Sequence, residues 1–593
     1  MWKLPVLLGL LFVAVLSVFG EKSTDRSSNR PNIVVIIADD LGWNDVSFHG
    51  SLQIPTPNID ALAYSGIILN RHYAPPLCTP SRASLMTGKH PINIGMQHHV
   101  IEVDEPWGLG LDQKLMPEYF REAGYRTRLV GKWHLGFFRK AYTPTMRGFD
   151  SHYGYIGPYI DYWDHSLQMS NTSTRGLDMR RNLQVDYSAR GTYATDLFTR
   201  EAVRLIHDHN QTSANPLFLV VTHLAPHTGN EDDPMQAPEE DVELFSFIKD
   251  PKRRVLAAMI SKLDDGVGQI VQALKKSGML NNTVVLFYAD NGAPTVGKHS
   301  NGGSNFPLKG QKYSPWEGAV RTAAAIWSPL LNNTGRVSNQ WIHVSDWLPT
   351  LARAAGIEAN FSGSEIDGQN QWDALNNPNL TGRTTVMHNI DQFQHYSSYT
   401  KSGWKLVNGT SWEGAFDDWM GSLDEEDELS EEEYSVRLIS SVVGRLTKVD
   451  LDDVARIRRD ATVHCPYIPG GTIDCEPRKS PCLFNILEDP CETNNIANQR
   501  PDLLKQLGQD VERYRLSATE PRNQPADPYS DPRYYNRTWT WWQDELDEAR
   551  DIKFPLAIFI VSITFIAIML IVVKPILCPS TKRKFQKKKK KKK

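Results

Sequence analysis

The sequence predicts an α/β protein in which a large, mostly parallel central sheet is flanked by helices, followed by a smaller C-terminal subdomain with an antiparallel sheet. Three continuous apolar runs, 33–38, 217–221 and 284–289, are typical of parallel strands that are buried on both faces. Helix-like stretches at 115–123 and 253–275 alternate with these runs, as in a parallel sheet. Polar residues follow all three runs, and ligand sites in such sheets form beyond the carboxyl ends of the strands.

The second half of the chain has a different pattern of predicted helices and strands. A capped helix is expected at 345–355, and from about residue 397 short alternating segments such as 404–407 predict antiparallel hairpins. We therefore expect a main domain over 31–396 and a C-terminal subdomain over 397–535. The acidic run 424–433 is expected to be a solvated loop.

Composition excludes several classes of protein. The chain has 593 residues, of which 40% are hydrophobic, and it contains 16 Trp, 21 Tyr and 21 Phe, so it is not a disordered, collagenous or coiled-coil protein. Eleven Lys and Arg residues lie among the last twenty, which leaves a net charge of about −15 on the rest. We therefore expect no nucleic-acid partner.

Both ends of the chain predict targeting segments. Residues 1–20 have the basic start, apolar run and small-residue end of a secretory signal peptide. Residues 554–573 carry no charge and are long enough for a transmembrane helix, with a membrane-proximal stem at 536–553 and a basic tail at 574–593. The positive-inside rule puts that tail in the cytosol, so we expect a type I single-pass protein with a lumenal or extracellular body, in the lysosome, the Golgi or at the cell surface. The terminal Lys run is also what a translated polyadenylate tract would encode.

Sequons and cysteines agree with a secretory compartment. Eight glycosylation sequons lie between the apolar ends, at Asn171, Asn210, Asn281, Asn332, Asn360, Asn379, Asn408 and Asn536. Four clustered cysteines, Cys465, Cys475, Cys482 and Cys491, are expected to form two disulfides whose connectivity the sequence leaves open. Cys78 has no partner, because Cys578 lies on the cytosolic side.

Two polar pairs at strand ends predict a metal site. Asp39 and Asp40 follow the first apolar run, and Asp290 and Asn291 follow the last one. These hard oxygen donors suit Ca²⁺ or Mg²⁺ rather than Zn²⁺. Either pair alone could be a helix cap or a turn, but two matching pairs favour a metal.

Cys78 lies in the motif Cys78-Thr79-Pro80-Ser81-Arg82, followed by Leu85-Met86-Thr87-Gly88. Pro80 fits the first position of a helix, so Cys78 is expected just before a helix N-terminus with the Arg82 cation nearby. Amide hydrogens and a cation together favour an oxyanion at this point.

These residues resemble the sulfatase family. The Cys78 motif matches the first sulfatase signature, and residues 124–134, GYRTRLVGKWH, match the second. Residues 305–312, 316–318, 148–150 and 388–391 are most similar to the arylsulfatase B branch, the N-acetylgalactosamine-4-sulfatases. The resemblance covers about residues 31–525. It implies the alkaline-phosphatase-like sulfatase fold, with 31–396 as the catalytic domain.

The resemblance also implies a chemistry and a set of residues. Cys78 resembles the cysteine that a formylglycine-generating enzyme oxidises to formylglycine, whose hydrate attacks sulfur. The implied ligands of one Ca²⁺ are the modified Cys78 together with Asp39, Asp40, Asp290 and Asn291. The resemblance also implies that Arg82 and Lys132 stabilise the hydrate and the sulfate and that His134 acts as a base. It implies Lys312, rather than Lys309, as the second sulfate-binding lysine. The implied leaving-group histidine is His227, rather than His223.

The expected activity is Ca²⁺-dependent hydrolysis of sulfate esters, on sulfated sugars such as N-acetylgalactosamine 4-sulfate of glycosaminoglycans. Two alternatives stay open: a phosphatase or phosphodiesterase of the same superfamily, which would usually present Ser or Thr as its nucleophile, and an inactive glycan-binding protein. The chain departs from the arylsulfatase B pattern in lacking cysteines after His98-His99 and in carrying the span at 554–573. The individual substrate, the organelle and the oligomeric state are not fixed by the sequence.

Overall fold

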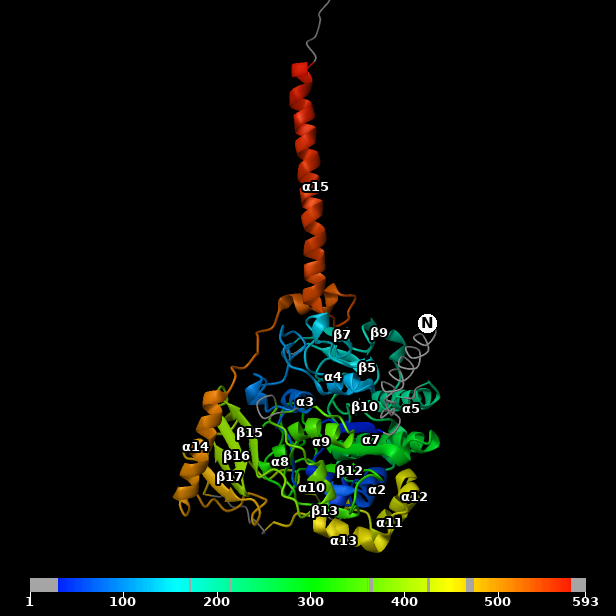
Figure 1. Cartoon of the computed structure of the whole chain (residues 1–593), viewed down its shortest axis with the longest axis vertical. Coiled ribbons are helices and arrows are strands. Elements are labelled where there is room, and N and C mark those ends of the chain that lie inside the picture. The colour runs from blue at the N-terminus through cyan, green and yellow to red at the C-terminus, as the bar shows by residue number, and fades with distance from the viewer. Residues whose placement is uncertain are drawn as a thin grey trace, which may run out of the picture. The chain divides into compact units, whose positions relative to one another are not determined.

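A computed structural model describes residues 30–577, except 170–171, 213–214, 360, 362–365, 424–426 and 466–473; for 210–212, 551–559 and 569–577 it describes only the backbone. The predicted signal peptide, Cys578 and most of the basic tail therefore lie outside the described residues. The chain divides into one compact unit that ends at Thr540 and a second that starts at Trp541. Figure 1 shows the computed structure of the whole chain and labels many of its helices and strands.

A sheet of ten strands forms the centre of the first unit. Its strands, in spatial order, are β13 (Arg336–Ser338), β2 (Ile67–Leu69), β12 (Ala324–Trp327), β11 (Thr283–Ala289), β1 (Asn32–Ala38), β10 (Leu217–Thr222), β4 (Arg126–Lys132), β5 (Ser151–Tyr155), β8 (Arg180–Arg181) and β9 (Gln184–Val185). The five strands from β11 to β5 are parallel, and antiparallel strands extend the sheet on both sides. The three predicted strands are confirmed as β1, β10 and β11, every residue of which is buried.

Two groups of helices flank this sheet. One group is α2 (Pro57–Ser65), α5 (Ala194–Thr212) and α7 (Pro251–Lys276); the other is α3 (Cys78–Thr87), α4 (Met116–Glu122) and α9 (Trp347–Ala354). Asp250 caps α7 by accepting hydrogen bonds from two amides of its first turn, and Pro251 occupies the first helical position. The shorter helices are α6 (Glu239–Glu243), α8 (Glu317–Val320) and α10 (Trp372–Asn376). The predicted helices at 115–123, 253–275 and 345–355 are confirmed as α4, α7 and α9.

A second, four-stranded antiparallel sheet follows in the sequence, as predicted. It consists of β15 (Thr385–Asp391), β16 (Tyr396–Lys401), β17 (Trp404–Asn408) and β18 (Cys482–Asn485), with α14 (Pro501–Ser517) packed against it. The C-terminal subdomain was expected to begin at residue 397, but the first strand of this sheet, β15, ends before that residue. Two small ribbons complete the strands: β3 (His72–Tyr73) with β14 (Ile342–His343), and β6 (Ser166–Gln168) with β7 (Arg175–Leu177).

The acidic run 424–433 is not a loop throughout, which corrects the prediction. Its last three residues form the first turn of α11 (Glu431–Ser440), where Ser430 and Glu433 make a reciprocal capping box. Acidic side chains at a helix N-terminus are stabilised by the helix dipole, so this charge run signals a helix start. The helices α11, α12 (Val442–Thr447) and α13 (Leu451–Ala461) all contact α2 of the main domain.

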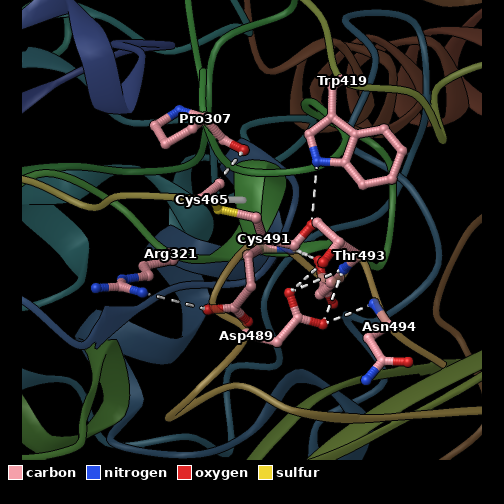
Figure 2. Close-up of a disulfide and its surroundings, with 10 residues drawn as sticks. Pro307, Arg321, Trp419, Cys465, Asp489, Cys491, Thr493 and Asn494 are labelled. Carbon is pink, nitrogen blue, oxygen red and sulfur yellow. Dashed lines mark hydrogen bonds and ion pairs between the residues drawn. A yellow bond between two sulfur atoms is a disulfide. The ribbon is translucent and has the colours of Figure 1, made fainter. Parts of the chain in front are cut away.

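Two disulfides form among the four clustered cysteines, as predicted, and they join Cys465 to Cys491 and Cys475 to Cys482. Figure 2 shows the first of these, where the Trp419 indole N–H donates a 3.0 Å hydrogen bond to the carbonyl of Cys491. The adjacent turn is held by Asp489, whose carboxylate accepts hydrogen bonds from the amides of Thr493 and Asn494. Cys78 is a free, buried thiol.

The sequons whose side chains are described lie at the surface. Asn281, Asn332, Asn379 and Asn536 are exposed, and Asn408 is half-buried. Asn171, Asn360 and the side chain of Asn210 fall outside the described residues.

The second unit contains the helix α15 (Trp542–Leu577), which includes the segment 554–573. Among the residues that the structure describes, no helix has the length and apolarity needed to cross a membrane, so the predicted span is not supported.

Candidate active site

The two polar pairs of the sequence meet at the carboxyl ends of β1 and β11. These strands are parallel neighbours with Ala38 opposite Ala289, so the residues that follow them lie side by side. The Asp40 amide donates a 3.2 Å hydrogen bond to Asp290 Oδ1, and Asn291 Nδ2 donates a 2.6 Å hydrogen bond to Asp40 Oδ1. All four polar side chains are completely buried.

Three cations surround these carboxylates. Lys132, the last residue of β4, places Nζ 2.6 Å from Asp39 Oδ2. Lys312, from the loop before α8, places Nζ 2.7 Å from both oxygens of Asp40. Arg82 lies on α3 and contacts Asp290 at 2.8 Å and Asp39 at 3.4 Å. We call this set the strand-end cluster: Asp39, Asp40, Cys78, Arg82, Lys132, Asp290, Asn291 and Lys312.

Cys78 begins α3 and points into the strand-end cluster. Its Sγ lies 3.6 Å from Asp39 Oδ1, and Asp39, Asp40, Cys78 and His227 offer ligand atoms that all lie within 4.8 Å of one another. Burial raises the pKa of the thiol to about 12, although Lys132 and Lys312 oppose the change. The encoded thiol is therefore protonated at neutral pH and is not an activated nucleophile. The helix begins at Cys78 itself rather than at Pro80, which corrects the prediction and places Cys78 in the first turn.

Two histidines adjoin the cluster. His227 follows the cis peptide bond between Ala225 and Pro226, and its Nε2 lies 3.4 Å from Asp40 Oδ2. His134, with a left-handed φ of 59°, contacts the Ile101 carbonyl through Nε2 at 2.9 Å, and its buried Nδ1 has no hydrogen-bond partner among the described residues. Burial lowers the pKa of both rings, to about 3 for His227. Both rings are neutral at physiological pH and can accept a proton.

The charges of the strand-end cluster balance. Three carboxylates face three cations, so the buried set is close to neutral when all six are ionised. Burial would raise the pKa of Asp40, but the Lys312 ammonium reverses this and lowers it. Burial and the neighbouring Asp39 raise the pKa of Asp290. A bound divalent cation would shift the balance to a net positive charge, which attracts a substrate anion.

The donor set fits a hard divalent cation such as Ca²⁺. Asp39, Asp40 and Cys78 offer ligand atoms within 4.8 Å of one another, and Asp290 and Asn291 are hydrogen-bonded to Asp40 beside them. Carboxylate and amide oxygens are the ligands that Ca²⁺ prefers. The buried Asn291 Oδ1 has no hydrogen-bond partner among the described residues, which leaves an acceptor oxygen free to bind a metal.

The sequence did not single out several neighbours of the cluster. Tyr159 stacks on His227 with ring centroids 5.7 Å apart, and His299 lies 6.1 Å from the same ring. Asn301 donates hydrogen bonds to the carbonyls of Asp40 and Pro226 and so joins two of the loops. No short motif marks these residues. His223, the alternative to His227, is buried beside Gly266 of α7, and its nitrogens have no hydrogen-bond partner within the described ranges.

Comparison with known proteins gives consistent matches. The family model "Sulfatase" matches residues 31–357, more than half of the chain. Arylsulfatase J of Mus musculus is 34% identical over 529 residues, covering 89% of this chain and 83% of its own. N-acetylgalactosamine-6-sulfatase of Sus scrofa is 31% identical over 393 residues, covering 63% and 73%. The crystal structure of Ps i-CgsB in complex with k-i-k-neocarrahexaose superposes with a TM-score of 0.65 at 27% identity, covering 86% of this chain and 97% of that one.

A wider set of solved structures shares the fold. The phosphonate monoester hydrolase of Agrobacterium radiobacter aligns with a TM-score of 0.50 at 16% identity. At this identity the alignment shows a common fold and nothing about activity. The narrower resemblance to the arylsulfatase B branch stays a prediction. The matched model, the curated relatives and the architecture together mean that this chain is a sulfuric ester hydrolase and belongs to the sulfatase family.

Proposed function

We propose that the strand-end cluster is the active site of a Ca²⁺- and formylglycine-dependent sulfatase that releases inorganic sulfate from sulfated sugars. The observation that carries the proposal is the buried Cys78, which has no disulfide partner and faces three carboxylates and three cations at the ends of parallel strands. A sulfated sugar such as N-acetylgalactosamine 4-sulfate of glycosaminoglycans is the proposed substrate, in keeping with the N-acetylgalactosamine-6-sulfatase among the relatives.

The metal would be held by Asp39, Asp40, Asp290, Asn291 and the modified Cys78. A Ca²⁺ ion at that point would supply Lewis-acid stabilisation of a sulfate oxygen. Residue 78, once converted to formylglycine, would supply the nucleophilic hydroxyl and a second hydroxyl that permits release of the sulfate.

The remaining residues bind the anion and move protons. Lys132 and Lys312 would hold the sulfate oxygens from two sides, and Arg82 would hold the hydrate of residue 78. These positive charges stabilise the negative charge that gathers on the oxygens in the transition state. His227 would assist departure of the sugar alcohol, and His134 would take the proton when the hydrate collapses.

The proposed setting is the secretory pathway, with the body in the lumen or outside the cell. A formylglycine-generating enzyme is then the biosynthetic partner. Sequons at the surface and two disulfides suit this compartment.

The test compares an aryl sulfate with the matching aryl phosphate, using Ca²⁺-loaded protein made in cells that contain the modifying enzyme. We expect hydrolysis of the sulfate in large excess, together with formylglycine in the tryptic peptide 72–82 by mass spectrometry. Preferred hydrolysis of the phosphate would support the phosphatase alternative instead. Absence of both activities in fully modified protein would support an inactive glycan-binding protein.

A further inference from the structure

Thr79 follows Cys78 in the first turn of α3, and it is completely buried. Its hydroxyl donates a 3.3 Å hydrogen bond to the carbonyl of His134 and accepts a 3.2 Å hydrogen bond from the amide of Ile101. Both partners lie outside α3, one directly after β4 and the other in the loop before α4. The hydroxyl therefore does not cap its own helix, which is the usual role of a threonine near a helix N-terminus.

A closed set of three hydrogen bonds joins these residues. The ring of His134 contacts the Ile101 carbonyl through Nε2 at 2.9 Å, which completes the set begun by the two bonds of the Thr79 hydroxyl. We call this set the Thr79 triangle: Thr79, Ile101 and His134. All three bonds are buried, so the loss of one leaves polar groups without a partner and away from water.

The Thr79 triangle fixes which nitrogen of His134 can act as a base. A carbonyl oxygen only accepts hydrogen bonds, so the Nε2 atom that faces Ile101 carries the proton of the neutral ring. The other nitrogen, Nδ1, is then the acceptor, and it is buried with no hydrogen-bond partner among the described residues. The triangle thus leaves the basic nitrogen of His134 free to take a proton.

The backbone of His134 also depends on its neighbours. Its φ of 59° lies in the left-handed region, which costs free energy for a residue with a Cβ and persists where the surroundings impose it. Ile156, directly after β5, accepts a 3.2 Å hydrogen bond from the His134 amide. Thr79 holds the carbonyl of the same residue, so the strained backbone is fixed on both sides.

We propose that Thr79 is a positioning residue that sets the orientation and the tautomer of His134. This inference rests on the proposed function, in which His134 takes a proton, and it names the group that holds that base in place. The hydroxyl of Thr79 is used within the triangle both as a donor and as an acceptor. Thr79 therefore acts through His134 rather than on the substrate.

Three substitutions separate the hydroxyl of Thr79 from its shape. Thr79→Val keeps a branched side chain and removes both hydrogen bonds, Thr79→Ala removes the hydroxyl with a smaller side chain, and Thr79→Ser keeps the hydroxyl. Thr199→Val is the matched control, because Thr199 is a buried threonine of α5 whose hydroxyl donates a 2.8 Å hydrogen bond to the Thr195 carbonyl of the same helix. Mass spectrometry of the tryptic peptide 72–82 gives the formylglycine content, and rates are expressed per modified molecule.

The kinetic signature follows from the step that His134 serves. Because this base acts after the alcohol has left, Thr79→Val should lower kcat on an aryl sulfate by about 10- to 100-fold, lower KM with it, and leave kcat/KM within about threefold. Pre-steady-state mixing should then show a burst of about one aryl alcohol per modified molecule. Thr79→Ala should give the same signature, whereas Thr79→Ser and Thr199→Val should retain the wild-type kinetics within about threefold.

Hydrogen–deuterium exchange supplies a readout that does not depend on turnover. The Ile101 amide loses its acceptor in Thr79→Val and Thr79→Ala, so peptides that contain Ile101 should exchange at least about tenfold faster at that amide. Thr79→Ser and Thr199→Val should leave this exchange unchanged.

The inference is overturned if the two variants without the hydroxyl keep the wild-type kcat, if kcat/KM falls as much as kcat, or if exchange at Ile101 is unchanged. Failure of the proposed function has a different signature: either the fully modified wild-type protein does not hydrolyse the aryl sulfate, or His134→Ala turns over normally. An active sulfatase in which His134→Ala gives the burst and Thr79→Val does not would refute the role of Thr79 alone.

Discussion

Two buried ionic clusters of this sulfatase differ in how their charges are arranged. The strand-end cluster joins three acids and three cations from separate elements around Cys78. The second cluster, which we call the Lys405 cluster, consists of Glu317, Lys405 and Glu492. The Lys405 ammonium lies 2.8 Å from each of the two carboxylates, and Glu492 also accepts a 2.8 Å hydrogen bond from the Glu317 amide.

This difference in charge arrangement distinguishes a proposed binding site from a cluster that stabilises the fold, which we call a structural brace. In the Lys405 cluster one cation lies between two carboxylates, with Tyr73 donating a further hydrogen bond to Glu317. In the strand-end cluster, Asn291 Oδ1, Arg82 Nε and His134 Nδ1 lack hydrogen-bond partners among the described residues. Burial and charge are common to both clusters, whereas a buried cysteine without a disulfide partner is found only in the first of the two.

The largest expected effect comes from Cys78. Cys78→Ala should lower kcat on an aryl sulfate by at least about 10⁴-fold, because no other side chain supplies the nucleophile. The melting temperature should change little, since the thiol forms no disulfide. Turnover assays and calorimetry check both halves of this prediction. Residual turnover near the wild-type rate would remove Cys78 from the mechanism.

The next effect concerns the metal. Asp290→Asn should weaken Ca²⁺ binding and lower activity by at least about 100-fold, because a hard cation loses one of three carboxylates. Ca²⁺-dependent thermal stabilisation provides a readout that does not depend on turnover. Asp373→Asn, at an exposed aspartate, is the matched control. Unchanged activity after thorough metal removal would contradict the assignment.

A substitution in the Lys405 cluster should lower the stability of the fold rather than the binding of a metal. Lys405→Met removes the ammonium between two buried carboxylates and leaves Glu317 only the more distant Arg321, at 4.0 Å, so it should lower the free energy of unfolding by about 3–5 kcal/mol. Lys401→Met, on the neighbouring strand, removes a partly exposed ion pair with Asp510 and should cost less than about 1 kcal/mol. Denaturant titrations compare the two variants. Equal stability of both would show that the Lys405 cluster is not a brace.

The smallest expected effect is a pH dependence of stability. Burial raises the pKa of Glu492 from 4.5 to about 7, although Lys405 opposes the change. The folded state therefore retains a proton that the unfolded state releases, so stability falls as pH rises from about 4.5 to 7, by up to about 3 kcal/mol. Glu492→Gln should remove this part of the slope, as measured by unfolding at several pH values. A slope identical to that of the wild type would assign the effect to other groups.

The sequence predicts the centre of the molecule better than its edges. Strands β1, β10 and β11 are continuous β-branched runs, and the acids that follow β1 and β11 signal the site because neighbouring parallel strands end at the same edge. The antiparallel additions such as β2, β8 and β12 have two to four residues, too few to show a period.

The contacts among four aromatic rings could not be predicted, for a different reason. His98, Tyr313, Phe393 and Trp412 come from distant parts of the chain, and only the tertiary fold brings their rings together. The start of α11 was missed because a run of acids was interpreted as solvated, although Ser430 and Glu433 carry the capping pattern.

The Lys405 cluster also bears on how this chain could be divided. Lys405 comes from β17, whereas Glu317 begins α8, five residues after Lys312. A fragment that ended at 396 would keep Glu317 and lose the Lys405 ammonium that lies 2.8 Å from it, next to the loop that carries Lys312. We therefore expect that the domain with the larger sheet does not fold stably without the strand of the smaller sheet that carries Lys405.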